Sequence, residues 1–144
     1  MHQLSLFDDT ATRLGDLDAA IARAMHQAFA RCGKSKDEIV DAMNAVADRG
    51  RFKLTKGNAK ALTVATFEKW LSVKEKHHVP PSRAINAFCE VVKDLTPLQV
   101  QLQVHCADIM TPKDKKLRDY GAIVIKDRKT KRDKRKMEEE LFYE

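Results

Sequence analysis

The chain has 144 residues, of which 43% are hydrophobic and 33% charged. This length and apolar content suffice for one moderate core, so we expect one domain with extensions and exclude two full domains. Glycine and proline are scarce, and the β-branched residues are scattered among good helix formers. The sequence therefore predicts an all-α fold.

The formal net charge of +6 is unevenly distributed. Residues 1–18 carry −3 and the last eight residues −4, whereas 19–110 carry +5 and 113–136 carry +8. A polyanion such as DNA responds to this local potential. A tail that is only a solvated charged helix is the open alternative.

The three cysteines, Cys32, Cys89 and Cys106, are odd in number and widely spaced, which is typical of a reducing compartment with small buried thiols. The N-terminus lacks the pattern of a signal peptide, and no segment approaches the roughly 20 apolar residues that span a bilayer. We expect a cytoplasmic protein without membrane contact.

The first third of the chain predicts an acidic arm and two helices. Residues 1–16 are expected to be a flexible arm, and the main domain, 17–110, begins with a helix over 17–31 that Gly33 ends. The second helix is predicted from 36 to about 48, with Gly50 at its end. Its start matches a capping box of Ser35 and Glu38.

A third helix is predicted over 63–72, and the apolar spacing within this and the second helix is that of a helix-turn-helix. Thr63 is a good N-cap, and Phe67, Trp70 and Leu71 recur on an inward face, with Trp70 as a core anchor rather than a base-stacking platform. The surface of this helix offers Thr63, Val64, Ala65, Glu68 and Lys69.

A long basic insertion, 49–61, stands where a helix-turn-helix normally has a turn of three or four residues. We interpret it as an enlarged turn, a mobile loop or a short hairpin; a floppy insertion with incidental charge is the alternative. The cations that we expect along a phosphate backbone are Arg49, Arg51, Lys53, Lys56 and Lys60.

Three further helix starts follow. Pro81 suits the first turn of a fourth helix, and Thr96 is expected to cap a fifth, whose apolar face includes His105. Thr111 repeats the start signal for a charged helical extension, 111–144. A short strand at 122–125 is an alternative to one long, partly free C-terminal helix.

The order of these features resembles the lambda-repressor-like helix-turn-helix domains. Residues 33–39 resemble the entry to their second helix, 62–70 (Leu-Thr-Val-Ala-Thr-Phe-Glu-Lys-Trp) their recognition helix and 78–89 their proline-started last helix. Together with the charged helix after a Thr-Pro start, the last two segments are similar to small DNA-binding proteins of Mu-like phages and prophages. The basic insertion departs from this pattern.

The resemblance implies a non-catalytic protein that binds double-stranded DNA, a phage or prophage transcription regulator, with the helix over 63–72 in the major groove. Lys69 would meet a guanine or a phosphate, Glu68 a cytosine, and Val64 or Ala65 a thymine methyl. Base readout would be modest and phosphate contacts dominant. A homodimer through the fifth or the C-terminal helix would place two recognition helices about one DNA turn apart.

The sequence contains no pattern for catalysis, a metal or a cofactor. Its histidines and cysteines lack the Cys-x-x-Cys and His-Glu-x-x-His spacings, and its glycines lack the context of a phosphate loop. The residues concerned are His77, His78, His105, Cys89 and Cys106. We expect neither enzyme activity nor a small-molecule substrate.

The alternative function is a phage-encoded protein interaction module that keeps the helix-turn-helix shape without binding DNA. Apolar residues near the C-terminus, Met137, Leu141 and Phe142, have a spacing suited to a partner helix or to a second copy of the chain.

Overall fold

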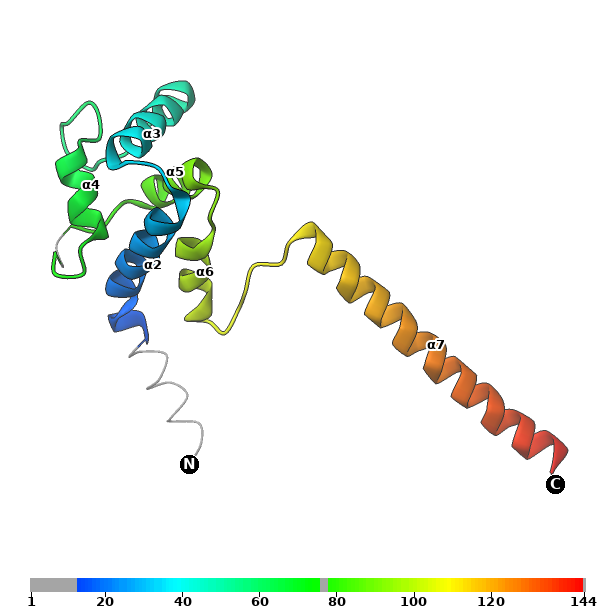
Figure 1. Ribbon diagram of the computed structural model, residues 1–144. Coiled ribbons are helices and arrows are strands. Elements are labelled where there is room, and N and C mark those ends of the chain that lie inside the picture. Colours follow the sequence, from blue (N-terminus) through cyan, green and yellow to red (C-terminus); the bar gives the residue numbers. More distant parts are fainter. Residues whose placement is uncertain (1–12, 76–77, 144) are drawn as a thin grey trace. The chain divides into compact units, whose positions relative to one another are not determined.

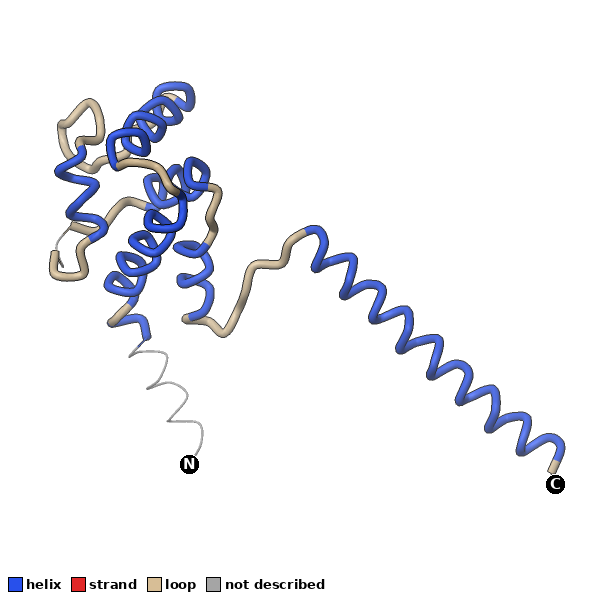
Figure 2. Tube along the Cα trace, in the orientation of Figure 1, coloured by secondary structure: helices blue, strands red, loops and turns tan. Residues whose placement is uncertain are grey.

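The computed structural model describes residues 13–75 and 78–143, and all regular structure within these ranges is helical (Figure 1, Figure 2). The helices are α2 (Leu17–Cys32), α3 (Lys36–Gly50), α4 (Val64–Leu71), α5 (Ser82–Val92), α6 (Thr96–Gln103) and α7 (Pro112–Phe142). The all-α prediction is confirmed. The strand considered at 122–125 is wrong, because these residues lie inside α7.

The chain divides into two compact units, residues 1–108 and 109–144. Most of the arm expected over 1–16 lies outside the described residues, and residues 13–15 are helical. No helix in the described ranges combines the length and the apolar character that a membrane crossing requires.

Side chains fix the starts of three helices as the sequence predicts. Ser35 Oγ accepts from Glu38 N at 3.2 Å while a Glu38 carboxylate oxygen accepts from Ser35 N at 3.0 Å, which completes the capping box of α3. The Thr63 hydroxyl caps α4, and Thr111 forms a second capping box with Asp114 at the start of α7. Such caps contribute about 0.5–2 kcal/mol each.

Several expectations around α6 are wrong. Thr96 is the first residue of α6 rather than its cap, and a carboxylate oxygen of Asp94 accepts the Thr96 N–H at 3.0 Å. The helix ends before His105, so this side chain is exposed instead of joining the core. Cys106 is exposed as well, whereas Cys89 is buried, and burial raises the pKa of its thiol to about 11.

The core of the 1–108 unit holds the inner side of α4. The helix α2 contacts α4, α5 and α6, while α3 contacts α4 and α5 (Figure 1). Phe67 is fully buried, with its ring centroid 6.4 Å from that of Phe29 and 5.9 Å from that of Phe88. Trp70 is buried, as predicted. Burial stabilises by about 1.5–3 kcal/mol per ring and an aromatic contact by about 0.5–1.5 kcal/mol more.

The helix α7 has no buried residue. Its 31 residues make a helix about 46 Å long. Ion pairs at i,i+4 spacing, such as Lys131 with Asp127 at 2.9 Å and Arg135 with Glu139 at 3.1 Å, each stabilise it by a few tenths of a kcal/mol. Hydrogen bonds from the Thr111 hydroxyl and backbone to Asp114 lower the pKa of that carboxyl.

We expect Phe67→Ala to destabilise the 1–108 unit by about 3–5 kcal/mol, because the substitution leaves a cavity between Phe29 and Phe88. The melting temperature should fall by about 10 °C or more. Fluorescence of Trp70, the chain's single tryptophan, follows this unit during a thermal scan. Gln27→Ala, at an exposed position of α2, serves as control and should leave the midpoint nearly unchanged. Equal shifts in the two variants would contradict the assignment of Phe67 to the core.

Candidate nucleic-acid interface

The outer side of α4 presents four of the five residues predicted to face bases. Thr63, Ala65, Glu68 and Lys69 are exposed. The outward prediction for Val64 is wrong in part, because this side chain is half-buried and packs against the core. Val64 is the first residue of the short helix α4, and the packing of this helix on its neighbours turns the Val64 side chain toward the core.

Two of the exposed side chains already have partners within the protein. Lys36 Nζ of α3 lies 2.9 Å from a carboxylate oxygen of Glu68. The acid predicted to contact cytosine therefore already forms an ion pair within the protein. The Thr63 hydroxyl accepts from Thr66 N at 3.3 Å and lies 3.1 Å from Thr66 Oγ1. Ala65 and Lys69 are also exposed on the outer side, and they make no such contact with a described side chain.

The loop that precedes α4 is strongly cationic. No acid occurs between 49 and 67 in the sequence. All five residues predicted to contact phosphate are exposed, and the described residues offer none of them an ion-pair partner. These residues are Arg49, Arg51, Lys53, Lys56 and Lys60.

A tight turn begins this loop, two residues later than the predicted start at 49, because Arg49 and Gly50 belong to α3. Gly50 is the last residue of α3, and Arg51 adopts the left-handed conformation with φ 53°. The N–H groups of Arg51 and Phe52 donate to the carbonyls of Asp48 and Ala47 at 3.3 and 3.0 Å, which is a Schellman motif. A Cβ on Gly50 would lie 2.6 Å from the Phe52 ring, so any larger residue there requires the ring to move.

The loop is anchored rather than floppy throughout. Leu54 and Leu62 are buried, with exposed fractions of 4% and 3%, and residues 56–61 between them are exposed. Asn44 of α3 holds the end of the loop: its Nδ2 donates to Leu62 O at 3.0 Å and its Oδ1 accepts from Leu62 N at 2.9 Å. The residue before the cap of α4 is thus fixed at both main-chain groups.

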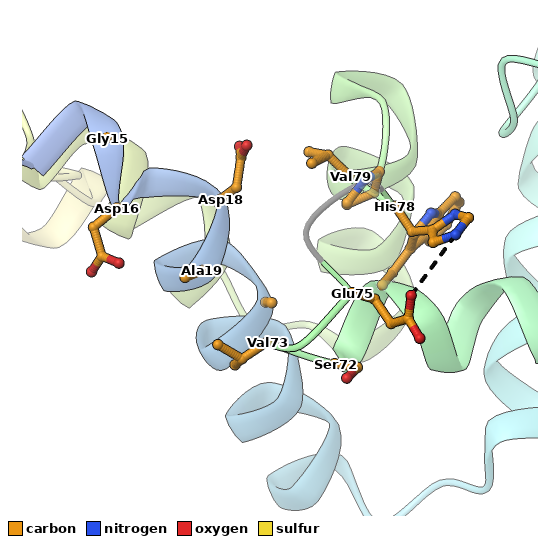
Figure 3. Close-up of a pocket in the computed structure, with 12 residues that line it drawn as sticks. Gly15, Asp16, Asp18, Ala19, Ser72, Val73, Glu75, His78 and Val79 are labelled. Atoms are coloured by element: carbon orange, nitrogen blue, oxygen red, sulfur yellow. Dashed lines mark ion pairs between the residues drawn. The ribbon is translucent and has the colours of Figure 1, made fainter.

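Three acids lie near the opposite end of α4, and one of them, Asp16, is paired with Arg23 at 3.0 Å. A cavity of about 200 Å³ beside Trp70 is lined by Asp16 and Asp18 from the start of α2 and by Glu75 and His78 from the segment after α4 (Figure 3). His78 Nε2 lies 3.9 Å from a carboxylate oxygen of Glu75. The cationic loop stands at the positive end of the α4 dipole and these acids at its negative end. The two ends of α4 therefore differ in local charge.

The histidines and cysteines considered at the outset do not come together. Cys89 is buried, whereas His105 and Cys106 are exposed, and His77 lies outside the described residues. Within the part of the chain that the structure describes, no three His, Cys, Asp or Glu side chains gather at a spacing suited to a metal ion.

Sequence reasoning missed two residues that shape this surface. Asn44 lies among the inward-facing residues of α3, between the buried Met43 and Ala47, and a polar side chain at such a place signals a main-chain partner. Leu54 is a lone leucine within the cationic stretch, which signals an anchor.

Comparison with protein-family models, curated proteins and solved structures found no match to the chain.

We expect Asn44→Ala to destabilise the 1–108 unit by about 1–3 kcal/mol, because both main-chain groups of Leu62 lose their partner. Asn44→Asp keeps an acceptor for Leu62 N but sets a carboxylate oxygen against Leu62 O, which also accepts, so it should destabilise the unit as well. Urea unfolding followed by Trp70 fluorescence measures both. If the two variants unfold at the midpoint of the unsubstituted protein, Asn44 does not hold the start of α4.

Proposed function

We propose that the 1–108 unit binds double-stranded DNA, with the N-terminal half of α4 at the major groove and the cationic loop along the adjacent phosphates. The observation that carries this proposal is the run of five exposed cations at 49–60, within a stretch free of acids that leads directly into the exposed start of α4. The acids at the other end of α4 favour one orientation on the duplex, because they repel phosphate.

In this proposal affinity comes mainly from phosphates and only in small part from bases. Glu68 is paired with Lys36 and Val64 packs inward, so Ala65 and Lys69 are the main candidates for base contact. Five phosphate contacts give a slope of about −4.5 for log affinity against log salt concentration. Binding is therefore semi-specific and strongly salt-dependent.

The finer form of the proposal is a lambda-repressor-like helix-turn-helix in a phage or prophage transcription regulator. It rests on the resemblance of 33–39, 62–70 and 78–89 to that family. The 13 residues from 51 to 63 take the place of the usual short turn. The two hydrogen bonds between Asn44 and the Leu62 main chain, which we call the Asn44 clamp, compensate for this length.

A protein interaction module is the second candidate, because α7 exposes large apolar side chains. Leu117, Tyr120, Ile123 and Ile125 are each between 59% and 70% exposed. Absence of duplex binding at low salt would favour this function over the first.

Replacing Arg51 by glycine tests the DNA-binding proposal without loss of stability. Glycine suits the left-handed conformation, so Arg51→Gly should raise the free energy of unfolding by up to about 1 kcal/mol while the salt slope on a random duplex falls by about 0.9. Lys53→Gln and Lys56→Gln added to it should bring the loss to between about 2 and 3.

Lys93→Gly is the matched control for Arg51→Gly. Lys93 is also a cation with left-handed φ, 55°, at the end of a helix, but it lies at the end of α5 and forms an ion pair with Glu90. It should gain similar stability and keep the salt slope of the unsubstituted protein. Equal slopes for the two glycine variants and for the triple loop variant would remove the loop from the interface.

A homodimer through the apolar residues of α7 would present two copies of α4 to one duplex. Sedimentation of the full chain is expected to give a dimer, and Ile123→Lys combined with Leu117→Lys should shift it to monomer, because both side chains are exposed. A monomer alone, with and without DNA, would contradict dimerisation.

A further inference from the structure

The middle of α7 carries a face composed of cations. Residues 126–136 comprise eight cations, two acids and one threonine, with no apolar side chain. At 3.6 residues per turn, six of the cations fall within about 160° of the helix circumference, and both acids fall outside this arc. We call these six residues the basic face: Arg128, Lys129, Lys131, Arg132, Arg135 and Lys136.

The acids of α7 neutralise only a part of the basic face. Lys131 is paired with Asp127 at 2.9 Å and Arg135 with Glu139 at 3.1 Å. The other four cations have no ion pair with any described residue, and every side chain of the face is exposed. A face of this kind repels a second copy of itself and attracts a polyanion.

The composition of this face favours nucleic acid over the other acidic partners. Protein interfaces have a core enriched in aromatic residues and depleted in charges, and residues 126–136 contain no apolar side chain that would form one. A helix that lies on a membrane needs an apolar side, whereas within 126–136 the side opposite the basic face holds Lys126, Thr130 and Lys134. Three of the six cations are arginines, whose planar guanidinium binds phosphate through two hydrogen bonds. An α-helix also fits the major groove, which is about 12 Å wide.

We propose that the basic face of α7 is a second duplex-binding element, separate from α4 and its loop, that contacts phosphates along a groove. The inference rests on the proposed function in one respect, the choice of duplex DNA as the ligand. Because both elements belong to one chain, binding of one raises the effective concentration of the other at the same duplex. The α7 element contributes affinity and salt dependence but little sequence preference.

The test compares two triple variants of the full-length chain that lose the same charge. The face variant is Arg128→Gln, Arg132→Gln and Arg135→Gln, and the control is Lys115→Gln, Lys126→Gln and Lys134→Gln, whose positions lie outside the arc. Each variant breaks one ion pair, that of Arg135 with Glu139 or that of Lys134 with Glu138. Glutamine has nearly the helix propensity of both cations, so circular dichroism should give equal helix content.

The readout is the slope of log affinity against log salt concentration on a 30-base-pair random duplex. The face variant should reduce the steepness of this slope by between about 2 and 3 and the control by less than about 1. Equal reductions would show an effect of net charge alone and overturn the proposal. No reduction in either variant would overturn it as well and leave an acidic protein as the partner of the face.

The loop variant Arg51→Gly, Lys53→Gln, Lys56→Gln separates this inference from the proposed function. If the loop variant binds as the unsubstituted protein does while the face variant loses slope, the proposed function fails and the α7 element stands. If the loop variant loses slope while the face variant matches its control, the α7 element fails and the proposed function stands. Losses in both that add in the combined variant support two separate elements.

Discussion

The side chain of Asn44 holds the main-chain N–H and C=O of Leu62, and the presentation of α4 depends on this contact. Leu62 stands directly before Thr63, whose hydroxyl caps the helix, so the clamp and the cap act on adjacent residues. The burial of Leu54 anchors the loop at a second point. Loop-closure entropy grows only slowly with length. The 13 residues that separate α3 and α4 therefore do not loosen the position of α4 against the core.

Charge is segregated within each of the two units, and the net charge of +6 conceals it. In the 1–108 unit, cations gather at the start of α4, while Asp16, Asp18 and Glu75 surround its far end. In α7, six cations share one arc of the helix and the acids of 126–136 lie elsewhere on it. Because screening limits charge interactions to about 10 Å at moderate salt, a partner responds to the charges nearest to it rather than to the net charge of the chain.

Local signals made the all-α fold and most helix starts predictable. A cap is decided within four residues, so Ser35, Thr63 and Thr111 were recognised from the sequence. The contact between Asn44 and Leu62 joins residues 18 apart and depends on tertiary packing, which periodicity does not report. The same limit explains the error at Val64, where spacing alone did not tell that the core covers this side chain. The errors at α6 are local: Asp94 accepts the Thr96 N–H, and the helix ends before His105. The sequence showed the cationic loop itself, but it did not predict that the burial of Leu54 anchors this loop.

The most direct test of the account is a titration of the full-length protein with a random duplex, followed by the NMR signals of backbone amides. Two groups of shifts are expected, one at 51–66, the loop and the first turn of α4, and one at 126–136 in α7, with the amides around Asp16, Asp18 and Glu75 unchanged. Shifts centred on those acids, or no shifts in the 1–108 unit at low salt, would contradict the proposed interface.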